Sequence, residues 1–287
     1  MTHLFRSLIF VPGNNQRFIE KAKSIDADIV CFDLEDSVPA KEKKAARNLI
    51  ADALASNHSH TFQIFVRINS PTSGNIPRDL EAITRKGLDG IVIPKVNSAT
   101  DIKRIANILS SLEKKRRLQP ICIIPSIESA KGVVNAYQIA SSSRRISALV
   151  FGVFDLLNDM GIEYSKDPPG ARFARAKIPV DAAAAGVSSI DAIWQDLEDP
   201  QGLEKDCKVG KSLGYSGKSI IHPDQIRTTH RIFHPTKTEL RWAETVCNSY
   251  MKAVKSGRGA TKIDGKMIDE VHFKQAKALL ETAGKHR

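Results

Sequence analysis

Short runs of apolar residues recur along the chain, and a segment with helical spacing of its apolar positions follows each run. The runs are apolar at nearly every position rather than at alternate positions, which is typical of parallel strands covered on both faces. Eight such units predict an α/β fold, a (β/α)8 TIM barrel, rather than an open doubly wound sheet. The predicted strands lie in residues 7–13, 28–36, 62–69, 90–96, 119–133, 146–156, 190–197 and 217–223.

The last part of the chain exceeds what closing a barrel requires. Its pattern predicts a helix over 238–254, a glycine-containing loop over 256–269 and a final helix over 270–284. We therefore expect a catalytic barrel domain over 1–235 and a C-terminal helical extension over 236–287.

The composition is ordinary for a globular protein, with 41% hydrophobic and 26% charged residues. No stretch approaches the ~18 consecutive apolar residues of a membrane span, and the N-terminus lacks the pattern of a secretory signal. Four cysteines without a CxxC pair are expected to be free thiols, which favours a cytoplasmic location. The net charge of +11 suits phosphate-bearing ligands, but the basic clusters lack interleaved aromatic residues, so we expect no nucleic-acid binding.

Polar residues end most of the apolar runs, at the rim where the catalytic side chains of barrels gather. Carboxylates held close together raise each other's pKa, so such a cluster requires a cation. Glu128 and Asp155 suit Mg²⁺, which binds one or two carboxylates together with water and substrate oxygens. Alternatively, the cations of the rim neutralise the acids in a structural ion network. The candidates are Arg6, Asp33, Glu35, Asp36, Arg67, Asn69, Lys95, Glu128, Asp155, Asp196 and His222.

Eight motifs together resemble a known family. They are RSLIFVPGNN, CFDLEDSVPAKEKKAAR, FVRINS, GIVIPKV, IPSIESAKGV, LVFGVFDL, GYSGKSIIHPDQI and GATKIDGKMID. In order and approximate spacing, the chain resembles the HpcH/HpaI aldolase and citrate lyase β-subunit family from about Arg6 to the last helix. The closest likeness is to stand-alone citrate-lyase-β-like proteins, which act on malyl-CoA or citramalyl-CoA.

The resemblance implies a Mg²⁺-dependent carbon–carbon lyase. Such an enzyme cleaves or forms a 3-hydroxyacyl-CoA, with acetyl-CoA and a 2-keto acid as the other reactants. The resemblance places the metal on Glu128 and Asp155, and Arg67 close to the substrate oxygens. It also implies a homotrimer, or a multiple of one, in which Asp269 of the C-terminal extension enters the active site of a neighbouring subunit.

Further residues are assigned supporting roles. We expect Arg6, Pro12 and Gly13 to contact the substrate around the first strand. Glu35 and Asp36 are expected to orient Arg67, Lys95 or a metal-bound water. No membrane partner is expected.

One residue departs from the family pattern. The family often carries an acid immediately before the aspartate that corresponds to Asp155, whereas this chain has Phe154. Phe154 can neither ligate a metal nor balance charge, which leaves the substrate range open. Two alternatives therefore remain: a CoA-independent class II pyruvate aldolase, or a catalytically weak barrel that acts as a binding protein.

Overall fold

The structure is a computed structural model, and it describes residues 5–56 and 61–284. The chain divides into two compact units, Met1–Arg231 and Ile232–Arg287. Each unit is described by itself below.

The first unit is a closed barrel of eight parallel strands in sequence order, with β1 paired to β8. The predicted (β/α)8 barrel is therefore confirmed. The strands are apolar along most of their length because their outer faces pack under helices while their inner faces fill the barrel. Their bounds are β1 Ser7–Pro12, β2 Ile29–Asp33, β3 Gln63–Arg67, β4 Gly90–Ile93, β5 Cys122–Ile127, β6 Ala148–Phe151, β7 Ser188–Asp191 and β8 Gly217–Ile220.

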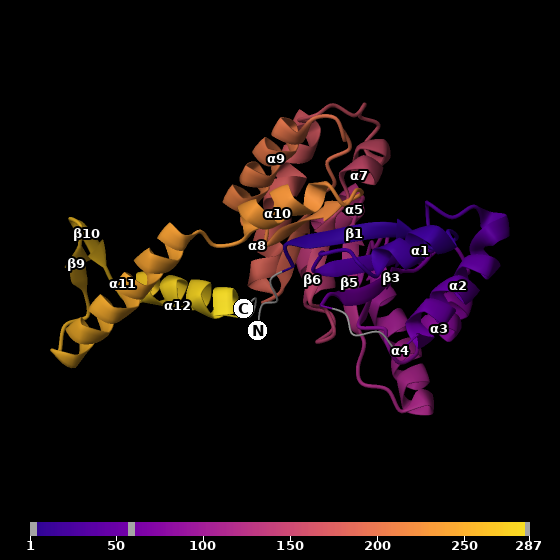
Figure 1. Cartoon of the computed structure of the whole chain (residues 1–287), viewed down its shortest axis with the longest axis horizontal. Coiled ribbons are helices and arrows are strands. Elements are labelled where there is room, and N and C mark those ends of the chain that lie inside the picture. Colours follow the sequence, from indigo (N-terminus) through magenta and orange to yellow (C-terminus); the bar gives the residue numbers. More distant parts are fainter. Residues whose placement is uncertain (1–4, 57–60, 285–287) are drawn as a thin grey trace. The chain divides into compact units, whose positions relative to one another are not determined.

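Helices surround the strands of the barrel (Figure 1). They are α1 Gln16–Ala22, η1 Ala40–Glu42, α2 Lys43–Ala55, α3 Ile76–Ile83, α4 Ala99–Arg116, α5 Ala130–Val134, α6 Ala136–Ala140, α7 Val153–Asp159, η2 Pro169–Ala171, α8 Arg172–Ala184, α9 Pro200–Leu213 and α10 Gln225–Phe233. None of the helices in the described part of the chain has the length and apolar character needed to cross a membrane.

The interior of the barrel changes from apolar to polar toward the carboxyl ends of the strands. Side chains two residues apart on a strand share a face. Phe65 belongs to the buried cluster inside the barrel, and Arg67 follows it on the same face of β3. Likewise Ile124 belongs to this cluster, Ser126 follows it on the same face of β5, and Glu128 comes directly after the strand ends at Ile127. The strand sequences thus place polar groups at one end of an apolar core.

The β6 region differs from its sequence prediction. The prediction had one strand over 146–156, but β6 stops at Phe151 and α7 begins at Val153. Asp155 therefore lies in the first turn of a helix rather than on a strand.

The sequence prediction also placed β7 too late in the chain. Residues 190–197 were expected to form this strand, but it ends at Asp191. Asp196 lies beyond the strand, where it pairs with Lys166 at 2.8 Å. The cause is the strand's own composition: Ser188 and Ser189 are buried in β7 despite their polar side chains, so the apolar pattern did not reveal them.

The second unit consists of two helices and a hairpin. They are α11 Lys237–Lys255, β9 Thr261–Ile263, β10 Lys266–Ile268 and α12 Glu270–Gly284. The helices share a buried apolar cluster, and the rings of Tyr250 and Phe273 stack at 5.1 Å. Residues 256–269 were predicted to be a loop, but they contain the hairpin. The signal was present: Asp264-Gly265, both with positive φ, is a preferred hairpin turn.

Candidate active site

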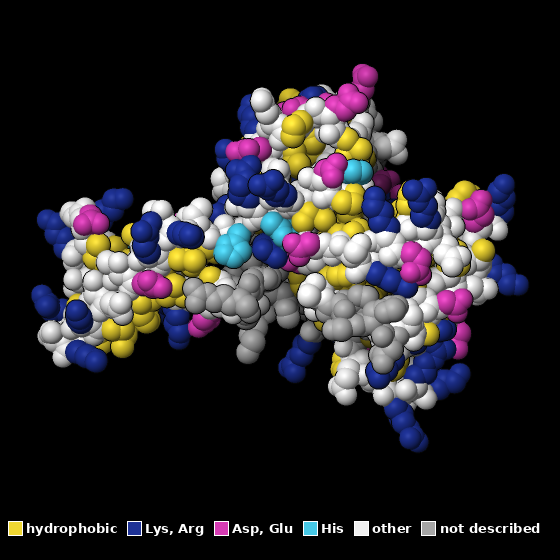
Figure 2. Space-filling view, in the orientation of Figure 1, with side chains coloured by type: hydrophobic (Ala, Val, Ile, Leu, Met, Phe, Trp, Pro, Cys, Tyr) yellow, Lys and Arg dark blue, Asp and Glu magenta, His cyan; other side chains and the backbone are white. Residues whose placement is uncertain are grey.

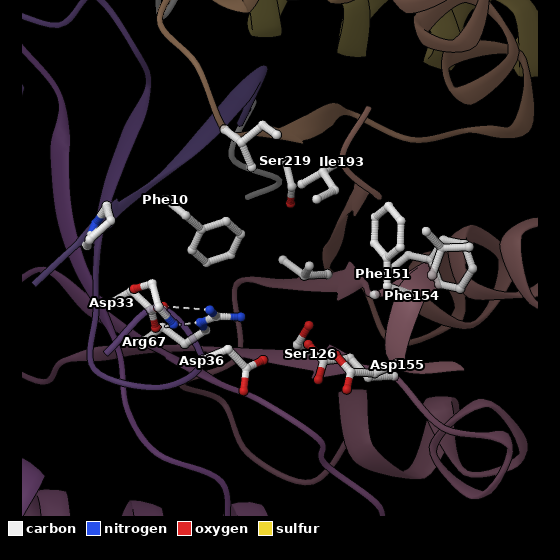
Figure 3. Close-up of a pocket in the computed structure, with 17 residues that line it drawn as sticks. Phe10, Asp33, Asp36, Arg67, Ser126, Phe151, Phe154, Asp155, Ile193 and Ser219 are labelled. Atoms are coloured by element: carbon white, nitrogen blue, oxygen red, sulfur yellow. Dashed lines mark hydrogen bonds and ion pairs between the residues drawn. The ribbon is translucent and has the colours of Figure 1, made fainter. Parts of the chain in front are cut away.

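A cavity of about 510 Å³ lies at the carboxyl ends of the barrel strands. Figure 3 shows Asp33, Asp36 and Arg67 on one side of it and Phe151 and Phe154 on the other. The lining residues are Phe10, Pro12, Asp33, Asp36, Ser37, Arg67, Ser126, Glu128, Val150, Phe151, Gly152, Val153, Phe154, Asp155, Ile193, Ser219 and Ile221.

Arg67 is held in place by Asp33, its partner in the register between β2 and β3. Two hydrogen bonds of 2.7 Å run from Nε and Nη2 of Arg67 to the two carboxylate oxygens of Asp33. Nη1 lies 3.4 Å from Glu35, and the guanidinium lies 4.8 Å from the centre of the Phe10 ring. Burial alone would raise the pKa of Asp33, but the hydrogen bonds from Arg67 lower it. The arginine is thus a preorganised, permanently charged donor.

Glu128 is a buried carboxylate that the surrounding backbone accommodates. The side chain is 6% exposed, and Oε2 accepts a hydrogen bond of 3.1 Å from the backbone N–H of Lys95. A Cβ on Gly152 would lie 2.3 Å from Cγ of Glu128, so glycine is needed to make room for the carboxylate. Burial, and secondarily the charge of Asp155, raises the pKa of Glu128. A cation bound nearby would oppose both effects.

The ammonium of Lys95 links three acids from two parts of the rim. Its Nζ lies 2.8 Å from Glu35, 3.1 Å from Asp36 and 3.6 Å from Asp155. The residue has a φ of 53°, an uncommon conformation for a residue with a side chain. This backbone geometry accompanies both its N–H bond to Glu128 and its ammonium contacts. Burial raises the pKa of Glu35 to about 7 despite its bond to Lys95 and the charge of Arg67.

The carboxylates fit a hard divalent cation. Glu128 and Asp155 line the same cavity, and both offer only oxygen ligands. Across the described residues, no three or more His, Cys, Asp or Glu side chains are grouped so that they could hold a metal ion. Two carboxylates are too few for a typical zinc site, but they suit Mg²⁺, which keeps several waters or substrate oxygens. The structural ion network considered from the sequence also exists, through Arg67 and Lys95. Among the described residues it includes no salt bridge to Glu128, whose carboxylate accepts the backbone N–H of Lys95.

The three residues around β1 that were predicted to contact substrate lie in different places in the structure. Pro12 lines the cavity. Gly13 does not, but it allows the chain to approach β2: its N–H donates to the carbonyl of Asp33 at 3.0 Å, and a Cβ there would lie 2.5 Å from that oxygen. Arg6 precedes β1, at the opposite end of the barrel, and binds Asp28 through bonds of 2.9 and 2.5 Å. We therefore remove Arg6 from the expected substrate contacts.

Asp269 belongs to the second unit, immediately before α12. Its Oδ1 accepts a hydrogen bond of 3.0 Å from the N–H of Val271 and lies 2.7 Å from Nδ1 of His272. The hydrogen bond with the His272 side chain lowers the pKa of Asp269. The residue therefore caps the helix, as aspartates often do, and is held as a carboxylate.

A family model described as HpcH/HpaI aldolase/citrate lyase matches residues 6–223. The chain belongs to this family. It is 32% identical over 282 residues to a (3S)-malyl-CoA thioesterase of Cereibacter sphaeroides, covering 98% of this chain and 95% of the relative. It is 33% identical over 289 residues to the mitochondrial citramalyl-CoA lyase of Rattus norvegicus, covering 97% and 86%.

A solved structure is also similar to this chain along nearly its whole length. It is protein CitE from Mycobacterium tuberculosis in complex with magnesium, acetoacetate and coenzyme A. The TM-score is 0.77 at 29% sequence identity, and the match covers 97% of each chain.

Ser219 is a cavity residue of this HpcH/HpaI family member that the sequence prediction missed. It lies on β8, 1% exposed, and its hydroxyl has no hydrogen-bond partner in the described structure. The motif GKSIIHP drew attention to His222, whose ring instead lies 3.4 Å from Asp224 outside the cavity lining. Ser219 on β8 and Ile221 just after it both line the cavity, as expected for residues two apart, because inward positions alternate along a strand.

Replacing Lys95 by methionine is expected to lower the free energy of unfolding of the metal-free protein by about 1–3 kcal/mol at pH 8. Glu35 would lose the ammonium that lies 2.8 Å from its Oε1. The pKa of Glu35 is raised to about 7 in the folded protein, so the ionised carboxylate is less favourable there than in the unfolded chain. The free energy of unfolding therefore falls as pH rises through about 7. The loss should therefore be smaller at pH 6, where Glu35 is largely protonated, and urea unfolding at both pH values measures it.

Lys95→Gly is the control for the unusual backbone conformation of residue 95. Lys95→Gly keeps the N–H bonded to Glu128 and accommodates the φ of 53° without strain. If the glycine variant shows the same pH-dependent loss of stability, the loss comes from removing the ammonium. An equal loss at pH 6 and pH 8 in the methionine variant contradicts the assignment to Glu35.

Proposed function

We propose that this protein is a Mg²⁺-dependent carbon–carbon lyase that cleaves or forms a 3-hydroxyacyl-CoA, with acetyl-CoA and a 2-keto acid as the other reactants. One observation carries the proposal: the buried Glu128 shares a cavity with Asp155 and with the preorganised Arg67. Similarity to a citramalyl-CoA lyase, and to a protein solved with magnesium and coenzyme A, supports both the metal and the CoA substrate.

The cleavage requires three changes at the substrate. A proton leaves the 3-hydroxyl oxygen, the bond between C2 and C3 breaks to give the keto acid and a thioester enolate, and a proton is added to the carbon of that enolate, so that no proton is gained or lost overall. Glu128 and Asp155 would hold the magnesium ion, which supplies Lewis-acid polarisation of the substrate oxygens when bound. Arg67 stabilises negative charge as it develops on oxygen, and its bonds to Asp33 mean that little reorganisation is needed.

The proton at carbon is assigned to Asp269. The hydrogen bond from His272 lowers the pKa of Asp269 and keeps it ionised, which is the form able to accept a proton from the acetyl-CoA methyl group in the condensation direction. In cleavage, the same group returns the proton. We propose, as the family resemblance implies, that Asp269 acts in the site of a neighbouring subunit of a homotrimer.

Asp269→Asn is expected to lower kcat by about 10²–10⁴-fold, the usual contribution of a general acid or base. If Asp269 serves a neighbouring subunit, hetero-oligomers of Asp269→Asn and Glu128→Gln subunits should recover part of the activity that neither variant has alone. The two forms are co-expressed with different tags, and the doubly tagged fraction is assayed.

The control for this variant is Asp264→Asn, on the exposed hairpin turn of the same unit, where asparagine also accepts a positive φ. Hetero-oligomers that assemble but remain inactive would show that Asp269 does not act between subunits.

The positive charge of the chain suits coenzyme A as a ligand. The net charge of +11 favours a ligand that carries several phosphates. On the face drawn in Figure 2, Lys and Arg side chains are spread over both units rather than gathered in one patch. The four cysteines are free thiols, which supports a cytoplasmic setting.

The test of the function is an assay of the purified protein with Mg²⁺ and a panel of 3-hydroxyacyl-CoA thioesters, including malyl-CoA and citramalyl-CoA. Release of acetyl-CoA and a keto acid that is abolished by a chelator is the expected result. Cleavage of free hydroxy-keto acids but not of thioesters would identify a pyruvate aldolase instead. No turnover of either class would favour the binding protein.

A further inference from the structure

Phe154 has a defined position beside the proposed metal site. It lies in the first turn of α7, directly before Asp155, and lines the cavity. Its ring centre is 4.7 Å from that of Tyr164, at an interplanar angle of 31°. Aromatic pairs at this separation stabilise each other's orientation. Phe154 is therefore a fixed part of the wall rather than a freely moving side chain.

Phe154 belongs to a larger apolar surface of the cavity. Phe151 and Val153, from the end of β6 and the start of α7, are buried beside it, and Ile193 follows β7. Figure 3 shows Phe151, Phe154 and Ile193 across the cavity from Arg67. A substrate group that lies against this surface exchanges water for hydrocarbon, which favours apolar groups and disfavours an unpaired charge.

The charged groups of the cavity leave little capacity for a second substrate anion. Four carboxylates line it, and among the described lining residues Arg67 is the one cation. Two of the donors of Arg67 are already bound to Asp33. The ammonium of Lys95 is likewise engaged by Glu35 and Asp36. Even with a divalent cation bound, the lining would carry no net positive charge.

We infer that Phe154 makes the cavity prefer 2-keto acids with a single carboxylate over those with two. In pyruvate and 2-oxobutyrate the other carbon group on the keto carbon is apolar, whereas in oxaloacetate it carries a second carboxylate. This inference rests on the proposed function and adds the class of the keto acid. One carboxylate of the substrate is held at Arg67 and the metal position. The remaining substituent lies against Phe154 and its apolar neighbours, where a second carboxylate would meet no cation among the described lining residues.

The inference is tested by calorimetric binding to the Mg²⁺-loaded protein. Pyruvate and 2-oxobutyrate are expected to bind at least about tenfold more tightly than freshly dissolved oxaloacetate, the discrimination typical of a pocket that leaves a polar group unpaired. Phe154→Lys should lower the affinity for pyruvate relative to that for oxaloacetate by about tenfold or more, because lysine supplies the missing cation. Phe154→Leu, which stays apolar, should retain the preference.

The matched control is Phe173→Lys, which adds the same charge at a phenylalanine that is 73% exposed on α8. It should leave the ratio unchanged. Oxaloacetate binding as tightly as pyruvate in the natural protein overturns the inference, as does a ratio that is unaffected by Phe154→Lys in a protein that circular dichroism shows to be folded.

Failure of this inference is distinguishable from failure of the lyase function. If thioesters that yield pyruvate and oxaloacetate are cleaved equally well, the lyase function stands and the role of Phe154 is wrong. If no thioester is cleaved but the keto acids still bind with the expected preference, the lyase function is wrong and the selectivity of the cavity stands.

Discussion

Glu128→Gln is expected to abolish Mg²⁺-dependent thioester cleavage, with kcat/KM falling by about a thousandfold or more. The substitution keeps the size of the side chain and removes its charge, so it removes an anionic ligand without leaving space. A metal contributes several kcal/mol of transition-state stabilisation, and each 1.36 kcal/mol corresponds to a factor of ten in rate. Activity measured across a Mg²⁺ titration, together with calorimetric Mg²⁺ affinity, reports the effect.

The same substitution should not destabilise the metal-free protein. Burial raises the pKa of Glu128, so its ionised form is a cost to folding that glutamine removes. Exposed Glu198→Gln, in the loop before α9, is the control and should change neither activity nor Mg²⁺ affinity. If Glu128→Gln bound Mg²⁺ as tightly as the natural protein, Glu128 would not be a ligand.

Arg67→Lys is expected to lower kcat/KM by about 10²–10³-fold, the usual cost of removing one preorganised donor to a developing oxyanion. Lysine keeps the positive charge but cannot reproduce the two parallel bonds of 2.7 Å to Asp33 while presenting a donor to the substrate. Steady-state kinetics with saturating Mg²⁺ measures the loss, which should fall mainly on kcat.

Arg67→Met separates catalysis from folding. It leaves Asp33, which is 1% exposed, without its ion-pair partner, and such a change typically costs about 3–5 kcal/mol of stability. The surface pair of Arg172 and Asp167 provides the comparison, since both side chains are more than half exposed. Arg172→Lys should alter neither stability nor rate measurably. Full activity in Arg67→Lys would assign the arginine a structural role only.

Local sequence was sufficient for the elements whose pattern is strong. Six of the observed strands are apolar at most positions because they are buried on both faces, whereas β8 carries Lys218 and Ser219. Seven of the eight strand predictions contain their observed strand completely. The exception is β7, whose buried serines carry no apolar signal. The hairpin after α11 was missed for a different reason: its strands are three residues long and mostly exposed, so the turn Asp264-Gly265 was the only usable indication.

The sequence also located the polar end of the barrel. Because catalytic side chains of a (β/α)8 barrel follow its strands, the order of motifs along the chain predicts that Arg67, Glu128 and Asp155 lie at one site. The structure lines one cavity with all three. It excluded Arg6, which the same motif reading had included, because that residue lies before its strand rather than after it.

By itself, then, the sequence determined the barrel, the family and the identity of the rim residues, since these depend on periodicity and on the order of motifs along the chain. Only the tertiary structure decided how the rim is arranged: that Asp33 orients Arg67, that Lys95 contacts acids from two segments, and that Phe154 packs on Tyr164 beside the cavity. Asp33 and Arg67 are separated by 34 positions, and Lys95 and Glu35 by 60. Such contacts depend on strand register and side-chain direction, which closure of the barrel specifies and local sequence does not.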